Sequence, residues 1–306
     1  MARHERGFVL GEDTPVHTAL THLNLLIADQ PIYAALLLFA KNPQRFVTSS
    51  EVKCLHYYGT QVQKPIPSYQ TYKGTLFDQI DQALDFVMAK LNRTVGTRSA
   101  GPTAPVEYEV PKDVISEAIV NAVVHRDYNS NAAVQVELFA DRLEVANPGH
   151  LPPELTPEKL RRPHSSIPHN PLIAEPMFLA HYIEKAGTGT VDMIARCQQA
   201  GLPEPTFEQR AGQFVVTIWR DWLTEAVKER LGLNERQRKA LILAKTAGRL
   251  TNTTYQDATG ASRATAKRDL EELVAKGVLL RSGRGRGASY VISTKRLKNG
   301  SNGSST

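Results

Sequence analysis

The chain has 306 residues, of which 41% are hydrophobic and 22% charged, and its net charge is +6. These values are typical of a soluble globular protein with two or three compact units. The longest apolar run, at 33–40, is far shorter than the ~20 residues that span a bilayer. The N-terminus lacks the apolar core of a signal peptide. The two cysteines are far apart in the sequence, which argues against a disulfide framework or a zinc site. We therefore expect a cytoplasmic protein with no membrane partner.

Residues 1–66 look too small to form a complete domain. The stretch at 18–27 predicts a helix, and the apolar runs at 33–40 and 49–60 predict two strands joined by a proline-containing loop. A proline-marked connector is predicted at 64–74. We expect this segment to pack on the domain C-terminal to it, or to be the remnant of a larger domain.

Residues 67–222 carry the pattern of an α+β domain, in which helices pack on an antiparallel sheet. Apolar residues at helical spacing predict a helix over 75–95, and Pro111 and Asp113 mark the start of another. A loop is predicted at 96–111, before this second helix. After the helix, strands are predicted at 132–141 and 142–149, followed by a proline-rich loop at 150–171. Two helical pieces within 172–201 and a hairpin at 205–220 complete the domain.

This second helix carries a thin polar stripe on an otherwise apolar surface. Glu117, Asn121 and His125 are spaced i, i+4 and i+8, which places them within ~80° of one another. Asn121 offers a neutral amide oxygen suited to Mg²⁺, and Glu117 could hold or deprotonate a water beside a terminal phosphate. His125 or Arg126 could contact phosphate oxygens. The alternative is a solvated polar seam at a domain edge, and the stripe alone does not decide between them.

Two further motifs point to a nucleotide. Asn147 and Gly149 lie at a predicted strand end, where an amide oxygen could accept a hydrogen bond from an adenine amino group. Gly187, Thr188 and Gly189 directly precede a predicted helix, whose first N–H groups bind phosphate well. Each motif alone is weak, because most glycine-rich turns are only turns, but the three in this order are considerably more specific.

Together these motifs resemble the GHKL ATP-binding fold of gyrase, a heat-shock chaperone, histidine kinases and mismatch-repair ATPases. The sequence is most similar to a subgroup of bacterial ATP-binding transcriptional regulators, whose pattern includes EAIVNAVVHRDY, NPG-LP, HNPLIAE and EKAGTGT, over roughly residues 20–295. The resemblance implies an α/β sandwich with helices on one face of the sheet and bound Mg²⁺-ATP. It implies Glu117 as the base, Asn121 as the Mg²⁺ ligand and Asn147 as the adenine contact, with Gly149, Gly187 and Gly189 as glycines of the nucleotide lid.

Two positions depart from the pattern. Asn147 stands where most GHKL proteins have an aspartate, so the hydrogen bond to adenine would lack a charge. Val124 stands where the kinase branch often has a lysine, which removes one phosphate contact. No histidine-containing dimerisation helix precedes the domain, so protein-kinase activity is not expected.

Positive charge is concentrated at the C-terminal end of the chain. Residues 231–306 hold 15 lysines and arginines against 5 acidic residues, or +10, whereas residues 1–230 hold 22 basic and 26 acidic residues, or −4. Such a basic module indicates a polyanion, most often nucleic acid. The alternative is a basic C-terminal segment that is soluble but binds no polyanion, and composition alone does not decide between the two.

This module resembles a winged helix-turn-helix. Helices are predicted at 234–248, 252–260 and 262–277, followed by two strands around a Gly/Arg tip at 278–293. Ser262 would cap the recognition helix. The expected DNA contacts are basic or polar residues on the early turns of that helix and arginines of the wing: Arg263, Thr265, Lys267, Arg268, Arg281, Arg284 and Arg286. The alternative is a winged helix used for protein contacts or dimerisation.

The resemblance implies four parts: residues 1–66 as the remnant of a Schlafen-like AlbA-type domain with a linker, 67–222 as the GHKL-type domain, 232–295 as the winged helix, and 296–306 as a disordered tail. The leading hypothesis is an ATP-binding transcriptional regulator, and a homodimer would match a two-fold operator. The sequence leaves open whether a weak Mg²⁺-dependent ATPase activity accompanies ATP binding. The alternatives are a Mg²⁺-dependent ATPase acting on nucleic-acid or protein complexes, and a DNA-binding protein with an inactive GHKL domain. No GxxxxGK[ST] phosphate loop occurs, so a helicase is not expected.

Overall fold

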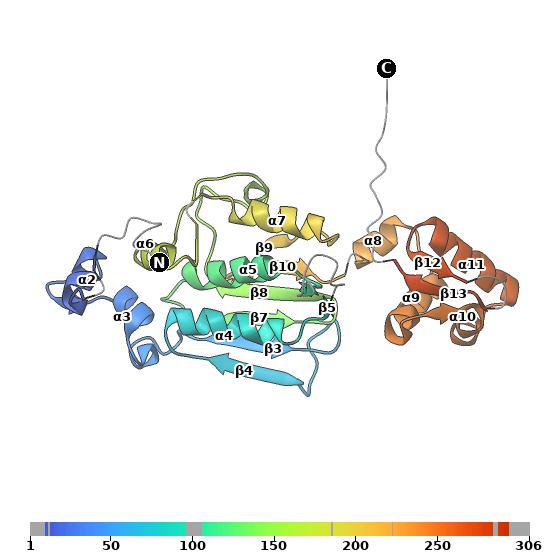
Figure 1. Ribbon diagram of the computed structural model, residues 1–306, viewed down its shortest axis with the longest axis horizontal. Helices are drawn as coiled ribbons and strands as arrows, with labels where there is room; N and C mark the ends of the chain where they lie inside the picture. The colour runs from blue at the N-terminus through green and yellow to red at the C-terminus, as the bar shows by residue number, and fades with distance from the viewer. Residues whose placement is uncertain are drawn as a thin grey trace, which may run out of the picture. The chain divides into compact units, whose positions relative to one another are not determined.

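The computed structural model describes residues 10–11, 13–95, 106–184, 186–221, 223–283 and 287–293. The chain divides into two compact units, Met1–Arg220 and Asp221–Thr306. Both combine helices with β-sheet (Figure 1). None of the helices within the described ranges has the length and apolar character needed to cross a membrane.

The first unit is built on a six-stranded mixed sheet with the order β4-β3-β7-β8-β10-β9. Its strands are β3 (Val52–His56), β4 (Ser68–Tyr72), β7 (Val134–Leu138), β8 (Arg142–Pro148), β9 (Thr206–Arg210) and β10 (Gln213–Trp219). Strands β3 and β7 pair in parallel, and the other pairs are antiparallel. The two predicted hairpins, β7–β8 and β9–β10, are confirmed.

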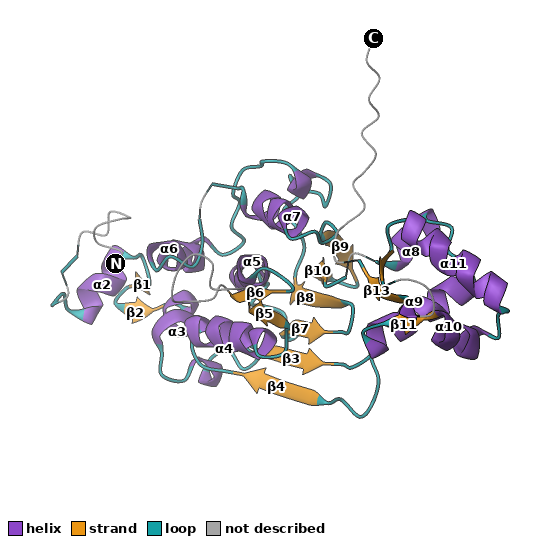
Figure 2. Ribbon diagram, turned by 45° about the vertical axis from the view of Figure 1, so that its right-hand side comes forward, coloured by secondary structure: helices purple, strands orange, loops and turns teal. Residues whose placement is uncertain are grey.

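Helices α4 (Leu76–Met88), α5 (Lys112–Val124) and α7 (Gly189–Gln199) lie against one face of this sheet (Figure 2). Helix α4 begins at a capping box in which Thr75 and Asp78 satisfy each other's backbone N–H groups. Helix α5 begins after Pro111, whose restricted φ suits a helix start. Eight of the thirteen residues of α5 are buried, because α4, α7 and the sheet surround it. The α+β expectation for this region is therefore confirmed, but the parallel β3–β7 pair makes the sheet mixed rather than wholly antiparallel.

Smaller elements complete the first unit. They are α2 (Val16–His22), β1 (Leu26–Ile27), β2 (Gln30–Pro31), α3 (Tyr33–Phe39), β5 (Arg93–Val95), β6 (Val106–Tyr108), α6 (Pro171–Leu179) and the 3-10 turns Pro43–Arg45 and Lys159–Arg161. Strands β5 and β6 pair with each other, so the predicted helix at 75–95 is too long at its end. The predicted loop at 96–111 includes β6, and its residues 96–105 lie outside the described part of the chain.

Two expectations for the N-terminal region are wrong. The run at 33–40 forms helix α3 rather than a strand. It consists mainly of alanine and leucine, which favour helices, and a short apolar run does not reveal its own period. The predicted connector at 64–74 contains the edge strand β4, which pairs with β3. Strands on both sides of residue 66 are thus neighbours in one sheet.

The second unit contains four helices among its described residues: α8 (Glu225–Arg230), α9 (Glu235–Ala247), α10 (Asn252–Thr259) and α11 (Arg263–Ala275). A three-stranded antiparallel sheet has the order β11-β13-β12, with β11 at Leu250–Thr251, β12 at Leu279–Ser282 and β13 at Ser289–Ile292. Buried apolar residues of all three longer helices form its core. The helices predicted at 234–248, 252–260 and 262–277 and the two strands predicted within 278–293 are confirmed. The short helix α8 and the short strand β11 were not predicted. The predicted tail at 296–306 lies outside the described residues.

Candidate functional site

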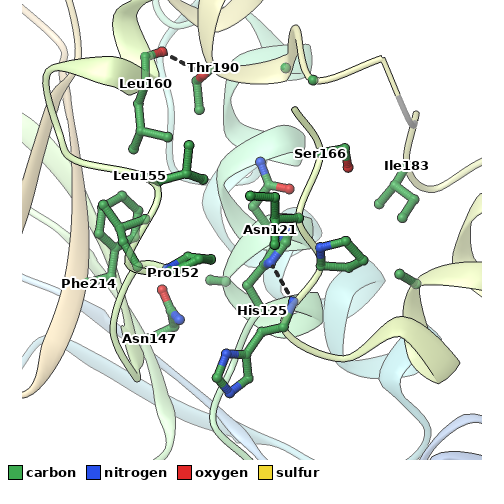
Figure 3. Close-up of a pocket in the computed structure, with 18 of the residues that line it drawn as sticks. Asn121, His125, Asn147, Pro152, Leu155, Leu160, Ser166, Ile183, Thr190 and Phe214 are labelled. Carbon is green, nitrogen blue, oxygen red and sulfur yellow. Dashed lines mark hydrogen bonds between the residues drawn. The ribbon is translucent and has the colours of Figure 1, made fainter. Parts of the chain in front are cut away.

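A cavity of about 520 Å³ opens beside helix α5 in the first unit (Figure 3). Its walls come from α5, the ends of β8 and β10, the loop after β8, the start of α6 and the segment that leads into α7. Six of the residues singled out from the sequence line it: Glu117, Asn121, His125, Asn147, Gly187 and Gly189. Gly149 and Thr188 flank lining residues without lining the cavity themselves. All three residues of the predicted stripe therefore face this cavity.

Glu117 and Asn121 form a hydrogen-bonded pair on α5. The Asn121 amide donates to Glu117 Oε1 over 2.9 Å, as expected for residues one helical turn apart. This bond uses the amide nitrogen of Asn121 and leaves its oxygen available to a ligand. The pair thus presents one carboxylate and one neutral oxygen to the cavity.

Burial raises the pKa of Glu117 above its ordinary value of 4.5. The bond from Asn121 opposes this shift, whereas the negative charges of Asp192 and Glu184 add to it. A carboxylate with a raised pKa is a stronger proton acceptor near neutral pH. The environment of Glu117 is therefore suited to a general base.

Gly187, two residues before α7, and Gly189, the first residue of α7, each lie too close to a neighbouring group to carry a side chain without displacing it. A Cβ atom at Gly189 would lie 1.9 Å from Glu117 Oε1, so any side chain there would displace the carboxylate. Gly187 has φ +68°, and a Cβ there would lie 1.8 Å from the backbone oxygen of His164. Helix α7 begins at Gly189 with no side-chain cap from Thr188, which leaves its first N–H groups for another acceptor.

His125 lies at the C-terminal end of α5, directly after the last helical residue. Burial, followed by the nearby His169, lowers the pKa of His125 to about 4. Its Nδ1 accepts a hydrogen bond from the backbone N–H of His169 over 3.3 Å. The imidazole is therefore neutral near pH 7 and faces the cavity as a hydrogen-bonding group rather than a cation.

Arg126, the other candidate for a phosphate contact, does not line the cavity. Arg126 is 1% exposed, and its guanidinium donates to Ser49 Oγ and to the backbone oxygens of Ser130 and Ala132. These bonds fix the turn after α5 to the segment before β3. The structure thus gives Arg126 a structural role.

Asn147 occupies the opposite side of the cavity, at the end of β8. Asn147 is 5% exposed, and its side chain makes no hydrogen bond within the described part of the chain. It is the cross-strand partner of Phe214, beside which it is seen in Figure 3. The surrounding lining residues are apolar: Val145, Leu151, Pro152, Leu155, Phe214 and Val216. Gly149 follows with φ +129°, a value that favours glycine, and donates to the Gly212 oxygen.

The proline-rich loop contributes residues that the sequence did not reveal. His150, His164 and His169 line the cavity together with His125, whereas none of the described lining residues is a lysine or an arginine. Asn170 anchors the loop, because its amide donates to the Val124 and Arg126 oxygens at the end of α5, each over 2.8 Å. The HNP sequence at 169–171 marks the position of this anchor, but the sequence alone does not show that Asn170 contacts the end of α5.

In the second unit, the basic residues expected on α11 are exposed. Arg263, Lys267 and Arg268 face solvent, whereas Thr265 is partly buried and its hydroxyl bonds to Ser262 Oγ. Arg281 on β12 is exposed. Arg284 and Arg286 lie outside the described residues.

A buried carboxylate fixes α11 in place. Asp269 is 1% exposed and accepts hydrogen bonds from the Tyr255 hydroxyl of α10, over 2.7 Å, and from Arg236 of α9, over 3.1 Å. This cluster ties the three longer helices together beneath the exposed basic side chains. The exposed basic side chains of α11 therefore lie on a helix that buried hydrogen bonds join to α9 and α10.

Comparison with known proteins agrees with this architecture. A family model of the HATPase type, described as "Putative ATP-dependent DNA helicase recG C-terminal", matches residues 131–218. This range contains Asn147 and the glycines before α7, but not α5. No curated protein matches the chain. The match supports an ATPase-type domain in the first unit.

The fold is also similar to a solved structure, that of the DIP2311 protein from Corynebacterium diphtheriae. The TM-score is 0.56 at 18% sequence identity, and the similarity covers 92% of this chain and 58% of that one. This chain thus spans somewhat more than half the length of its structural neighbour. At this identity the likeness shows the fold alone.

The glycine before α7 can be tested by substitution. Gly187→Ala should destabilise the protein and weaken ligand binding, because a Cβ would collide with a backbone oxygen as well as strain φ. Gly201→Ala is the matched control, since Gly201 has φ +73° with nothing within 4 Å of a Cβ. Thermal unfolding should show a larger loss for Gly187→Ala. Equal losses would mean that only the φ strain matters.

The buried carboxylate predicts a pH-dependent stability difference. Because the pKa of Glu117 is raised in the folded state, its contribution to stability is present at low pH and is lost as pH rises through that pKa. Glu117→Gln mimics the protonated form. It should therefore unfold at a higher temperature than the wild type at pH 7.5, and at the same temperature near pH 4. A variant less stable at pH 7.5 would contradict this account.

Proposed function

We propose that this protein is an ATP-binding transcriptional regulator, with Mg²⁺-ATP in the cavity of the first unit and DNA on the second. The observation that carries the nucleotide site is the buried Asn147 amide, which has no partner among the described residues and faces the same cavity as the Glu117–Asn121 pair. Buried polar groups are normally hydrogen-bonded, so an unpartnered one in a cavity is explained by a ligand. The volume of about 520 Å³ lies within the range of small-molecule sites, about 300–1,000 Å³.

The residues present suit each part of the nucleotide. Asn147 would contact the base between apolar walls, and the start of α7 at Thr188–Gly189 would receive phosphate oxygens. The amide oxygen of Asn121 would bind Mg²⁺, which neutralises phosphate charge when bound. This role matters here because Glu117 and Glu184 line the cavity while no described lining residue is a lysine or an arginine. Nucleotide binding should therefore depend strongly on the metal ion.

A second candidate function is a Mg²⁺-dependent ATPase acting on nucleic-acid or protein complexes. The raised pKa of Glu117 favours it, because a regulator that only binds ATP has no need of a general base. A DNA-binding protein with an inactive nucleotide domain is the remaining alternative. Since the chain contains no GxxxxGK[ST] phosphate loop, a helicase motor is not proposed.

The second unit is proposed to be a winged helix-turn-helix over residues 232–295. Helix α10, the turn at Gly260 and helix α11 have the required order, and Gly260 has φ +67°, which ends α10 in the left-handed conformation. The exposed Arg263, Lys267 and Arg268 would contact DNA, with Arg281, Arg284 and Arg286 on the wing. A homodimer would match a two-fold operator. We also propose that residues 1–66 derive from a Schlafen-like AlbA-type domain, and that nucleotide binding orders the segment at 187–189.

The nucleotide site is tested by binding and turnover of ATP. A fluorescent ATP analogue should bind the wild type in Mg²⁺ and bind at least about 10-fold more weakly when the metal is chelated. Glu117→Gln should retain binding and lose turnover by about 100-fold or more. Glu154→Gln is the control, since Glu154 is exposed and does not line the cavity.

The outcomes separate the candidate functions. Turnover that DNA stimulates and that Glu117→Gln abolishes would favour the ATPase. Binding of ATP without turnover would favour the transcriptional regulator over the ATPase. Absence of binding at millimolar Mg²⁺, in a folded protein, would support an inactive domain and contradict the proposal.

The DNA site is tested by salt dependence. Arg268→Ala should weaken DNA binding and reduce the slope of log K against log salt by about one, because one phosphate contact is removed. Lys239→Ala, an exposed charge removed from α9, is the matched control and should leave the slope unchanged. Fluorescence anisotropy over a salt series measures both. Equal effects of the two variants would show that only net charge, and not α11, attracts DNA.

A further inference from the structure

On the side of the cavity where we place the nucleotide base, the amide of Asn147 is available to hydrogen-bond with the base. Asn147 is 5% exposed, and no described residue hydrogen-bonds to its side chain. An amide carries both a donor and an acceptor group, so both remain available to a ligand. Because no described residue hydrogen-bonds to the amide, both of its orientations about the last side-chain bond are compatible with the hydrogen bonds of the site.

The strand ends and the loop next to Asn147 supply little further discrimination. Val145 and Val216 are almost fully buried lining residues, and the partner of Asn147 across the strands is Phe214. Within the described lining residues of 145–155, His150 is the other polar side chain. An imidazole can donate or accept according to its tautomer, so it does not fix the identity of the base either.

We propose that Asn147 makes this site accept purine nucleoside triphosphates with either a 6-amino or a 6-oxo group, an inference that rests on the proposed nucleotide-binding function. Adenine presents a donor at N6 and an acceptor at N1. A 6-oxo purine presents an acceptor at O6 and a donor at N1. These two edges are the reverse of each other, and the two orientations of one amide match them in turn. A carboxylate offers only acceptors, so it would match the adenine amino group and repel O6.

The experiment compares ATP with inosine triphosphate, which carries the 6-oxo edge without the 2-amino group of guanine. Calorimetric titration of the full-length wild type in Mg²⁺ should give dissociation constants for the two nucleotides within about 10-fold. Asn147→Asp should keep ATP binding and weaken inosine triphosphate binding by about 10-fold to 100-fold relative to ATP. Asn129→Asp is the control for added charge, because Asn129 is exposed and lies outside the lining of the cavity.

Each outcome decides the proposal. A wild type that binds ATP but binds inosine triphosphate more than about 100-fold more weakly would overturn it and leave the proposed function standing. The same holds if Asn147→Asp and the wild type show the same ratio of the two constants. A folded wild type that binds neither nucleotide would overturn both. Thermal melting of each variant confirms that it is folded before the titration is interpreted.

Discussion

Helix α5 must bury apolar side chains on nearly every side and yet keep a polar edge accessible, and the arrangement of the first unit depends on this constraint. Packing against α4, α7 and the sheet excludes water from most of its surface. The polar edge can then be tolerated only where the packing opens into a cavity. The same burial alters the acid–base properties of Glu117 and His125 in opposite directions, because it disfavours the charged form of each.

Three contacts between distant parts of the chain hold the walls of the cavity together. Asn170 joins the proline-rich loop to the end of α5, Thr190 donates to the Leu160 oxygen over 2.7 Å, and the Gly187 backbone lies against that of His164. They link the loop to the end of α5, to α7 and to the segment that precedes α7. A movement of the loop would therefore directly shift the end of α5 and the start of α7.

The sequence predicted most of the first unit between α4 and β10, because its helices and hairpins have clear periods and turn signals. It predicted the clustering of Glu117, Asn121 and Asn147 in one place through their resemblance to a family pattern and not through spacing alone. It did not predict the histidines of the loop, because a loop has no period from which a shared direction can be inferred. The strand expected at 33–40 was wrong for a related reason: helix and strand bury such a run equally well.

In the second unit the local signals were stronger. Caps at Asn234, Thr251 and Ser262 and left-handed glycines at 248 and 260 define the helix limits, so the order of elements could be predicted from short-range chemistry. The buried contact of Asp269 with Tyr255 and Arg236 could not, because it joins residues that only the folded chain brings together.

The position of β3 sets the smallest fragment of the first unit that can be expected to fold. This strand lies between β4 and β7, so it is internal to the sheet although it precedes residue 66. Cutting the chain after that residue would remove a central ladder, isolate β4 and withdraw Ser49 from the buried guanidinium of Arg126. An expression fragment for crystallography should therefore start upstream of α3, whose Leu37 and Leu38 belong to the same core.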